Sequence, residues 1–473
     1  MAIFPCDDDG NIIITNATLN IMEEEQSGTI DGSSESIHTA NQREFLGGLV
    51  SLDDDHHHLN GTATSTATSR ICIRDSVATG SVAVEEMVDL RRWFHARPEL
   101  AFEEYRTAAK VVETLRNIGL AEIYENVGKT GVVGLIRGSR AGGGEGDDGP
   151  CVALRADMDA LPVPETANVD YKSLHDGKMH ACGHDGHMAA LLGAARVMYE
   201  RRHLLHGTVK LVFQPAEEGY NGASAMINDG VLDDGPLGPK VDVIYGIHLW
   251  SHNPLGTIAA TEGPIMAASD RFTIDVRGKG GHGAAPHTTV DAIVETASVI
   301  QGLQTIISRN LDPLETGVVT CGTVKGGYGY NVIADHVEIT GTCRSFKPAV
   351  QEMIKTRMRC MCEGISLSFG GQIDMKYEYG YPPTVNAYPE HCAHVVSVGT
   401  ELVGKERAST SAVTMGAEDF SYYLLQRPGC FFFVGAALPG EIRGHHKSVF
   451  DFDERALQIS ASMFVGLVAK ILV

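Results

Sequence analysis

The chain has 473 residues, of which 43% are hydrophobic and 21% charged, a mixture typical of globular proteins. At roughly 150 residues per domain, this length predicts about three structural units with a sizeable core. The 38 Lys and Arg residues against 60 Asp and Glu residues give a formal net charge of −22. A chain this acidic repels nucleic acids and anionic membrane surfaces, so both classes of partner are excluded.

The first 80 residues differ in composition from the rest. They contain clusters of Asp and Glu, three consecutive histidines at 56–58 and a Ser/Thr-rich stretch at 62–69. Such a segment buries too little apolar surface to offset its ordering entropy, so we expect residues 1–80 to form an acidic, mostly disordered tail. The start lacks a basic, apolar leader, no apolar run reaches 18 residues, and the ten cysteines contain no CxxC pair. These features favour a cytoplasmic location.

Periodic structure begins near residue 82. Apolar residues at helical spacing predict a helix that stops before Pro98 and a second helix that ends at Gly119. A third helical pattern covers 185–200. Four short apolar runs predict buried strands: 131–136, 151–155, 208–213 and 241–247. Buried strands that alternate with helices predict a largely parallel α/β sheet covered on both faces.

The pattern changes after residue 264. Residues 271–277 alternate as in a half-buried strand, and Thr288 and Asp291 form a capping-box-like start to a helix that runs to about 309. Two strands, a helix and a last strand follow: 317–324, 336–346, 348–368 and 372–379. The order β-α-β-β-α-β is that of a ferredoxin-like module. We therefore predict a discontinuous catalytic domain, 81–264 plus 380–473, that carries a smaller domain inserted at 265–379.

Five segments concentrate the residue types that bind metal ions: Asp157 and Asp159; Cys182, His184 and His187; Glu217 and Glu218; His248; and His445 and His446. Three of the five follow predicted strands, where open parallel sheets collect their ligand sites. Thiolate, imidazole and carboxylate together suit Zn²⁺, Mn²⁺, Co²⁺ or Ni²⁺ better than Mg²⁺ or Ca²⁺. Of two adjacent carboxylates, one can bind an ion while the other moves protons. The pattern favours metal-dependent hydrolysis of an amide.

Six motifs in chain order carry a resemblance to a known family: HACGHDGH, QPAEEG, GIH, GKGGHGAAPH, MGAEDFSYY and HHKSVFDFDE. From about residue 85 to the C-terminus, the chain resembles the M20 metallopeptidase family. It is most similar to the amidohydrolase branch of aminoacylases, hippurate hydrolases and indole-acetyl-amino-acid hydrolases. The resemblance implies a zinc-peptidase-like α/β catalytic domain with an inserted ferredoxin-like dimerisation domain, and therefore a homodimer. It also implies cleavage of N-acyl-L-amino acids to a carboxylic acid and a free amino acid.

The resemblance further implies roles for single residues. Glu217 corresponds to the general base, and His282 to a catalytic histidine that reaches across a dimer to stabilise the oxyanion. Asn331 and Arg344 correspond to substrate-binding positions, and a guanidinium can pair with a carboxylate through two hydrogen bonds. Five residues correspond to ligands of two divalent ions, Mn²⁺ or Zn²⁺ with Co²⁺ or Ni²⁺ as further options: Cys182, which bridges the ions, His184, Glu218, His248 and His446.

The last ligand has an alternative. His446 is preferred over its neighbour His445 because its distance to Phe450 matches the family spacing. Lys447 and Ser448 stand where the family commonly has a Pro-containing sequence, so His445 is kept as the second candidate.

Several other polar residues are expected to support the site. We expect Asp159 to orient a ligand or the base. His187 is expected to be structural, and Glu418 and Asp419 to lie behind the ligands. The glycines at 278–283 are expected to form a tight loop that presents His282, since no GxxxxGK[ST] pattern of a phosphate-binding loop is present.

Two other functions are weighed against the amidohydrolase. One is an M20-type peptidase, or a deacylase of a diaminopimelate derivative, but the Cys-containing HACGHD motif favours the amidohydrolase branch. The other is a catalytically silent relative that acts as a scaffold. A decayed site would have lost a ligand or the base, and all of these residues are present.

Overall fold

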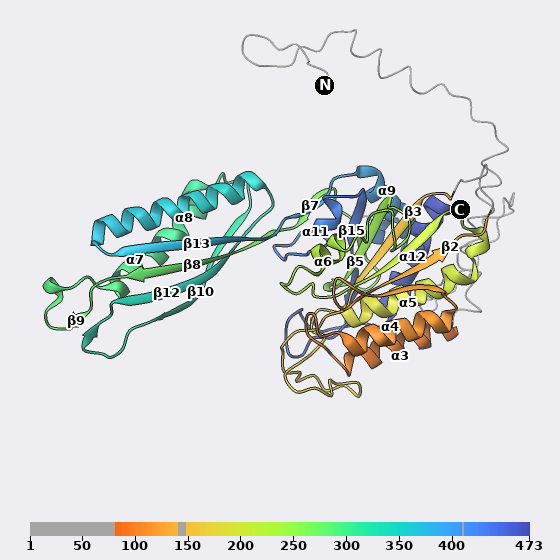
Figure 1. Ribbon diagram of the computed structural model, residues 1–473, viewed down its shortest axis with the longest axis horizontal. Helices are drawn as coiled ribbons and strands as arrows, with labels where there is room; N and C mark the ends of the chain where they lie inside the picture. Colours follow the sequence, from red (N-terminus) through yellow and green to blue (C-terminus); the bar gives the residue numbers. More distant parts are fainter. Residues whose placement is uncertain (1–80, 141–147, 409–410) are drawn as a thin grey trace, which may run out of the picture.

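The computed structural model describes residues 81–140, 148–408 and 411–473, and the predicted acidic tail lies outside this described part. Two lobes are visible, one built on a seven-stranded sheet and a smaller one on a four-stranded sheet (Figure 1). The chain enters the smaller lobe through residues 266–268 and returns through residues 381–384. The smaller lobe is therefore an insertion in the chain that forms the larger lobe.

The larger sheet has the strand order β1-β2-β4-β3-β5-β15-β6. The strands span Glu122–Val127 (β1), Gly131–Arg137 (β2), Cys151–Asp157 (β3), Thr208–Gln214 (β4), Val243–Pro254 (β5), Ile258–Ala259 (β6) and Gly429–Ala437 (β15). The four central strands β4, β3, β5 and β15 run parallel, whereas β1, β2 and β6 are antiparallel to their neighbours. The sheet is therefore mixed, with a parallel centre as predicted and antiparallel edges.

Helices cover both faces of this sheet, which confirms the predicted α/β class. The larger helices are α3 (Ser81–His95), α4 (Tyr105–Ile118), α5 (His184–Glu200), α9 (Pro389–Val403) and α12 (Arg455–Leu472). Side chains alternate along β3, so that Val152 and Leu154 join the core under these helices while Ala153 joins the core on the opposite face. The opposite face carries the short helices α6 (Gly222–Asn228) and α11 (Ser421–Leu424).

Within the described residues, the C-terminal helix α12 (Arg455–Leu472) is the one helix that is long and apolar enough, by length and composition alone, to cross a membrane. However, 78% of this window is buried inside the protein, where the helix packs against α5 and α9. An apolar helix surrounded by protein is a core helix, and α12 packs on one face of the larger sheet, against β3, β5 and β15.

The smaller lobe has the β-α-β-β-α-β order expected of a ferredoxin-like module. Its elements are β8 (Ala268–Arg277), α7 (Ala292–Thr305), β10 (Gly317–Gly326), β12 (His336–Ser345), α8 (Pro348–Phe369) and β13 (Gln372–Tyr381). The antiparallel strand order is β10-β12-β8-β13. Both helices lie on one face of the sheet (Figure 1), where the alternating residues Phe272, Ile274 and Val276 of β8 are buried.

The start of α7 differs in detail from the prediction. Asp291 is the N-cap, because its carboxylate accepts hydrogen bonds from the backbone N–H groups of Ile293 and Val294. Thr288 lies in a separate 3₁₀ turn, so its predicted role in a capping box is wrong. The helix ends at Thr305 and continues as a π-helical turn to Asn310.

Two short strand pairs complete the fold. At the junction of the lobes, β7 (Gly263–Met266) pairs with β14 (Thr384–Asn386). Within the smaller lobe, β9 (Gly281–His282) pairs with β11 (Val332–Ile333). Figure 1 shows β9 at the end of the smaller lobe that is remote from the larger lobe.

Candidate metal centre and active site

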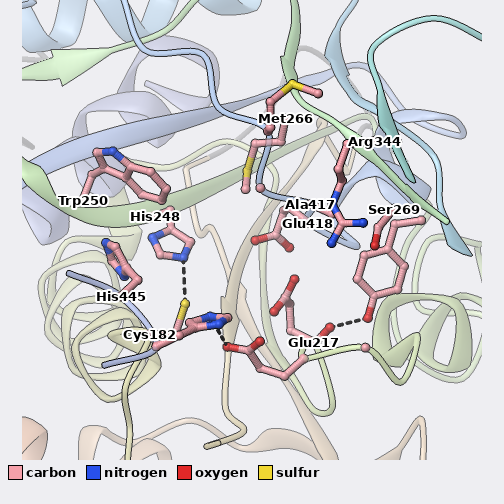
Figure 2. Close-up of a pocket in the computed structure, with 16 residues that line it drawn as sticks. Cys182, Glu217, His248, Trp250, Met266, Ser269, Arg344, Ala417, Glu418 and His445 are labelled. Atoms are coloured by element: carbon pink, nitrogen blue, oxygen red, sulfur yellow. Dashed lines mark hydrogen bonds and ion pairs between the residues drawn. The ribbon is translucent and has the colours of Figure 1, made fainter. Parts of the chain in front are cut away.

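A cavity of about 570 Å³ lies where the larger sheet meets the base of the smaller lobe. Its lining includes most of the predicted site residues: Cys182, Glu217, Glu218, His248, Arg344 and His446. Figure 2 shows Arg344 and Glu217 facing this space from opposite sides, with Cys182 and His248 along a third side. The cavity therefore gathers residues from five sequence segments into one site.

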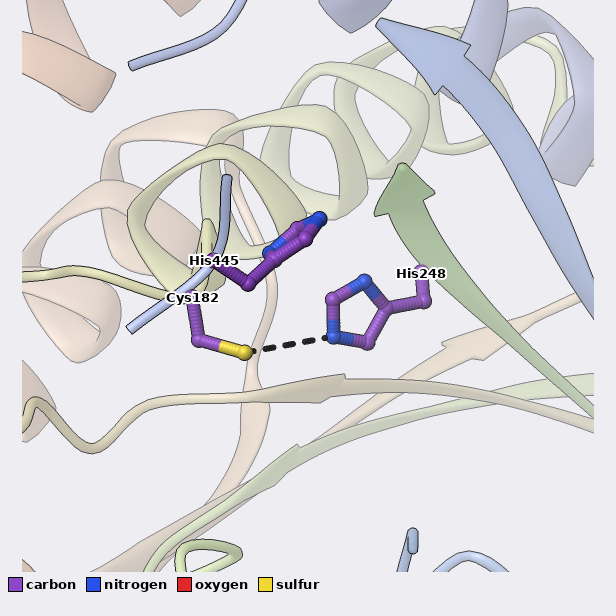
Figure 3. A group of neighbouring side chains, drawn as sticks. All are labelled: Cys182, His248 and His445. Atoms are coloured by element: carbon purple, nitrogen blue, oxygen red, sulfur yellow. Dashed lines mark hydrogen bonds between the residues drawn. The ribbon is translucent and has the colours of Figure 1, made fainter. Parts of the chain in front are cut away.

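Cys182 lies between two groups of metal-ligand atoms. Its Sγ is 3.4 Å from Nε2 of His248, and with His445 these residues place their donor atoms within 4.8 Å of one another (Figure 3). Cys182 also forms a second group with His184 and Glu218, whose donor atoms are again within 4.8 Å. A thiolate shared by two groups of ligands can bind two ions at once.

Hydrogen bonds of the far ring nitrogens aim the histidines at this centre. His184 opens α5, and its Nδ1 is 2.9 Å from the carbonyl oxygen of Asp159, which leaves Nε2 buried with no hydrogen-bond partner among the described residues. Nδ1 of His248 is 2.7 Å from the carbonyl oxygen of Leu249. A histidine that donates through one nitrogen presents the other as a lone pair, which is the usual arrangement at metal ions. The two rings are therefore prepared as ligands.

The position of His248 in its strand differs from the prediction. We expected a strand over 241–247 that ends at this residue, but β5 continues to Pro254 and His248 lies inside it. Its neighbour β3 pairs with β5 only as far as Gly246. Beyond that point one edge of β5 is free of β3, and His248 can therefore face the cavity from the middle of a strand.

His187 is structural, as expected. Its Nδ1 lies 2.6 Å from Asp157, and its Nε2 accepts a hydrogen bond from the backbone N–H of Leu249 at 2.9 Å. Both ring nitrogens are thus used by protein groups.

The two adjacent C-terminal histidines both reach the centre. Nε2 of His446 is 3.3 Å from a carboxylate oxygen of Glu218. Nε2 of His445 accepts a hydrogen bond from the backbone N–H of Ser251 at 3.2 Å, and its ring stacks on Trp250 with centroids 4.7 Å apart. Nδ1 of His445 is buried and has no hydrogen-bond partner within the described part of the chain. His446 therefore lies beside Glu218, whereas His445 lies beside Cys182 and His248.

Negative charge accumulates around the cavity. Arg155 is fully buried and pairs with Asp157 at 2.7 Å, Glu418 at 2.8 Å and Asp419 at 3.1 Å. Burial raises the pKa of Glu217 well above its ordinary value, and the neighbouring charges of Glu418 and Glu218 add to this. A site with more acids than cations is suited to bind cations.

The pKa values of the thiol of Cys182 and the imidazole of His184 also reflect the excess of negative charge in the site. Burial, followed by the charge of Glu218, raises the pKa of Cys182 well above its usual range. Burial lowers the pKa of His184, but the charge of Asp157 and a hydrogen bond to Asp159 outweigh it and raise that pKa to about 10. A divalent cation supplies the positive charge that otherwise has to come from these protons, and it favours the thiolate. The donor set therefore fits divalent ions.

The loop that carries Glu217 has an unusual backbone. It connects β4 to α6, and its residues Ala216 and Asn221 have positive φ angles of 55° and 61°. A Cβ atom on Gly222 would lie 1.6 Å from the carbonyl oxygen of Pro215, so a glycine is required there. Such a conformation persists because surrounding groups hold it.

Two carboxylates of the larger lobe hold this loop. The buried Glu104 accepts a hydrogen bond from the backbone N–H of Ala216 at 2.9 Å, and Asp159 accepts one from the N–H of Glu218 at 3.0 Å. Asp159 thus contacts both the Glu218 backbone and the ring of His184, which agrees with its expected orienting role. The sequence does not single out Glu104, because the adjacent Glu103 is the same residue type. Only the fold shows that Glu104 is buried whereas Glu103 is exposed.

Other cavity residues were also missed. Trp250, Met266 and Met415 supply an apolar wall, and Ser269 and Tyr381 belong to the strands of the smaller lobe that reach the cavity. Met266 lies two residues before β8 and Tyr381 ends β13, so both mark the points where the chain crosses between lobes. The sequence contains no motif around such single residues, so their place in the cavity could not be predicted from it.

His282 and Asn331 lie elsewhere. His282 is exposed in β9, and the backbone N–H of Gly283 donates to the carbonyl oxygen of Asn331 at 2.8 Å, so the two residues share one end of the smaller lobe. This end is remote from the larger lobe (Figure 1), and neither residue lines the cavity. Within one chain, the structure does not bring them to the other site residues.

Known proteins resemble this chain over most of its length. The model of Peptidase family M20/M25/M40 matches residues 153–470. The N-acetyl-L-cysteine deacetylase of Bacillus subtilis is 40% identical over 390 residues, which covers 82% of this chain and 89% of that protein. IAA-amino acid hydrolase ILR1-like 2 of Arabidopsis thaliana is 39% identical over 398 residues, which covers 82% of this chain and 85% of that protein.

A solved structure shares the fold. The YXEP protein of Bacillus subtilis, described as a dinuclear metal binding peptidase from the M20 family, superposes with a TM-score of 0.69 at 34% identity. The match covers 83% of this chain and 99% of that one. The chain therefore belongs to the M20/M25/M40 peptidase family, as the six motifs indicated, and is a hydrolase of amide bonds.

Proposed function

We propose that the protein is a metal-dependent amidohydrolase that cleaves N-acyl-L-amino acids, of the N-acetyl, benzoyl or indole-acetyl type, to a carboxylic acid and a free amino acid. The observation that carries this proposal is the cavity itself. A buried acid, Glu217, and a cation, Arg344, face each other across a space bordered by a thiol shared between two groups of metal-ligand atoms. The names of the similar proteins agree with this class of substrate.

Five residues would hold two divalent ions, Mn²⁺ or Zn²⁺, with Co²⁺ and Ni²⁺ as further options. Cys182 would be shared between the ions, and the other ligands would be His184, Glu218, His248 and His446. When bound, such ions polarise an amide carbonyl and lower the pKa of water. The Nε2 of His184, which has no hydrogen-bond partner among the described residues, supports its place in this set. The acidic groups around Arg155 support the binding of cations nearby.

Glu217 is the general base. Its side chain is 5% exposed, and burial among other acids raises its pKa, which makes the carboxylate a stronger base. It takes a proton from the attacking water and passes it to the leaving nitrogen, so that the amine departs neutral. Glu418 and Asp419 stand behind it and are held by Arg155.

Arg344 binds the carboxylate of the amino acid. Its side chain is partly buried at the edge of the cavity, and among the described residues it is the arginine that lines this space. A guanidinium fixes a carboxylate in one plane through two hydrogen bonds, which orients the amide towards Glu217.

His282 and Asn331 act in the active site of a second copy. They lie on the far end of the smaller lobe, so a partner chain has to supply them if they are to contact a substrate. We therefore propose a homodimer formed through the inserted domain at 265–379, with His282 stabilising the oxyanion in the partner's site.

The catalytic domain is proposed to comprise 81–264 plus 380–473. A cytoplasmic location is also proposed, because all eight cysteines in the described ranges are free thiols.

A peptidase is the second candidate, and one observation favours it. A second cavity of about 540 Å³ adjoins the first and shares Gly219, Ser269 and Tyr381 with it. A substrate that extends beyond a single amino acid would have room there.

The test is release of free amino acid from a panel of N-acetyl, N-benzoyl and indole-acetyl amino acids, alongside dipeptides and N-acyl-diaminopimelate, each with and without a chelator. We expect chelator-sensitive release from acyl-amino acids. Faster turnover of dipeptides would favour the peptidase. No release from any substrate by protein that carries bound metal would contradict both and leave the silent scaffold.

A further inference from the structure

Three cavity residues form a row across the sheet of the smaller lobe. Ser269 of β8 pairs with Arg344 of β12 on one side and with Tyr381 of β13 on the other. All three line the cavity that also contains Glu217. Because adjacent strands of one sheet move together, a change in the orientation of the smaller lobe displaces Arg344 and Tyr381 as a unit.

Tyr381 also contacts the backbone of the Glu217 loop. Its hydroxyl donates a hydrogen bond to the carbonyl oxygen of Glu217 and accepts one from the backbone N–H of Asn221 at 3.4 Å. The ring is 7% exposed and packs edge-on against Tyr422, with centroids 6.2 Å apart. The Tyr422 hydroxyl donates to the side-chain oxygen of Asn221 at 3.2 Å, so both tyrosines hold the same loop.

This contact differs from the other supports of the loop. Glu104 and Asp159, which hold Ala216 and Glu218, belong to the larger lobe. Tyr381 instead ends the strand that returns from the smaller lobe. Pro382 and Pro383 follow it, and since proline fixes φ, the chain leaves Tyr381 with little freedom.

We propose that Tyr381 is a positioning residue that couples the orientation of the smaller lobe to the general base. This inference rests on the proposed function of Glu217. A substrate carboxylate that engages Arg344 sets the orientation of the β12-β8-β13 row, and Tyr381 transmits that orientation to the backbone of Glu217. Binding of the amino acid part of the substrate thereby places the carboxylate that moves the proton.

The test uses the metal-loaded full chain and the variant Tyr381→Phe, which removes the hydroxyl and keeps the ring. Tyr379→Phe is the matched control, since its hydroxyl contacts Lys355 and Glu352 and no residue of the loop. We expect amide hydrogen exchange in a peptide covering 216–222 to quicken about tenfold in Tyr381→Phe, the effect of losing one hydrogen bond. The control should exchange as the wild type does.

Kinetics supply the second readout. On the best acyl-amino acid of the panel, kcat of Tyr381→Phe should fall about 10- to 100-fold while KM changes less than about threefold, because a displaced base slows the chemical step. Metal content should stay at the wild-type value. If Tyr381→Phe does not fold, Tyr422→Phe loosens the same loop through Asn221 and should change exchange and kcat in the same directions, by smaller factors.

The outcomes separate this inference from the proposed function. Unchanged exchange in the loop, or a loss confined to KM, would overturn the positioning role even if the wild type is an active amidohydrolase. Faster exchange with unchanged kcat in an active enzyme would overturn the coupling. A metal-loaded wild type that hydrolyses no acyl-amino acid would instead overturn the proposed function, and the exchange measurement would still decide whether Tyr381 holds the loop.

Discussion

Sγ of Cys182 lies 3.4 Å from Nε2 of His248, and the same sulfur belongs to a second group of ligands with His184 and Glu218. A thiolate sulfur is polarizable and can bind two ions through one atom, which suits a residue that belongs to both groups of ligands. Both proposed ion sites therefore depend on Cys182, which lies two residues before α5.

Replacing Cys182 should weaken the binding of both ions. We expect Cys182→Ala to retain less than one ion per chain, because each group of ligands loses a member, whereas Cys321→Ala should bind as the wild type does. Cys321 is a free, partly exposed thiol of the smaller lobe and controls for loss of a cysteine. Metal analysis of dialysed protein measures this, and full occupancy in Cys182→Ala would remove the thiol from the ligand set.

The neighbouring histidines can be separated by the same analysis. Since Nε2 of His446 is 3.3 Å from Glu218, we expect His446→Ala to lose about one ion per chain. His445→Ala should keep both ions, because Nε2 of His445 accepts a hydrogen bond from the Ser251 N–H, so that Nδ1 of the neutral ring carries the hydrogen. The reverse result would assign the ligand to His445 through its free Nδ1.

Local patterns predicted those elements whose signals lie within a few residues. The second helix ends at Gly119, which has a φ of 113° and thus the left-handed conformation that glycine favours. The alternation at Phe272, Ile274 and Val276 placed one face of β8 in a core. The family motifs singled out residues that do share a cavity, since their order and spacing are specific: Cys182, Glu217, Glu218, His248 and His446.

What the sequence did not reveal depends on distant pairing. β5 extends beyond His248 because its far half pairs with β15, about 185 residues away in the chain. The antiparallel strand β1 has an uneven burial pattern and gave no alternation. Tyr381 and Glu104 gained their importance from contacts with a loop more than 100 residues away, which no local pattern contains.

The dimer proposal predicts complementation. Glu217→Gln and His282→Ala should each be nearly inactive alone. When the two are mixed and allowed to exchange subunits, about a quarter of the wild-type activity should return, because half of the dimers are mixed and each has one complete site. Activity that stays at the level of the parents would show that His282 does not act across a dimer.

The buried Glu104 predicts a pH dependence of stability. Burial raises its pKa from the ordinary 4.5 to about 7, a difference that the hydrogen bond from Thr130 reduces and the charge of Asp159 increases. The folded protein therefore binds a proton that the unfolded chain releases above pH 4.5, and its stability falls as the pH rises from about 4.5 to 7.

Over this pH interval, the free energy of unfolding of the wild type should fall by roughly 3 kcal/mol relative to that of Glu104→Gln, because a glutamine stays neutral. Denaturant unfolding of chelator-treated protein at several pH values measures it. Glu103→Gln is the matched control, because the neighbouring Glu103 is largely exposed and pairs with Lys178. A wild-type minus Glu104→Gln difference that does not change with pH would contradict this account.

Glu217 is proposed to move the proton at a site whose ions are held by other residues. The most direct measurement compares metal content and kcat of Glu217→Gln with those of the wild type, on the best acyl-amino acid. We expect two ions per chain in both proteins and a fall in kcat of about 10²- to 10⁴-fold in the variant. A variant that keeps wild-type kcat, or one that loses its ions together with its activity, would contradict it.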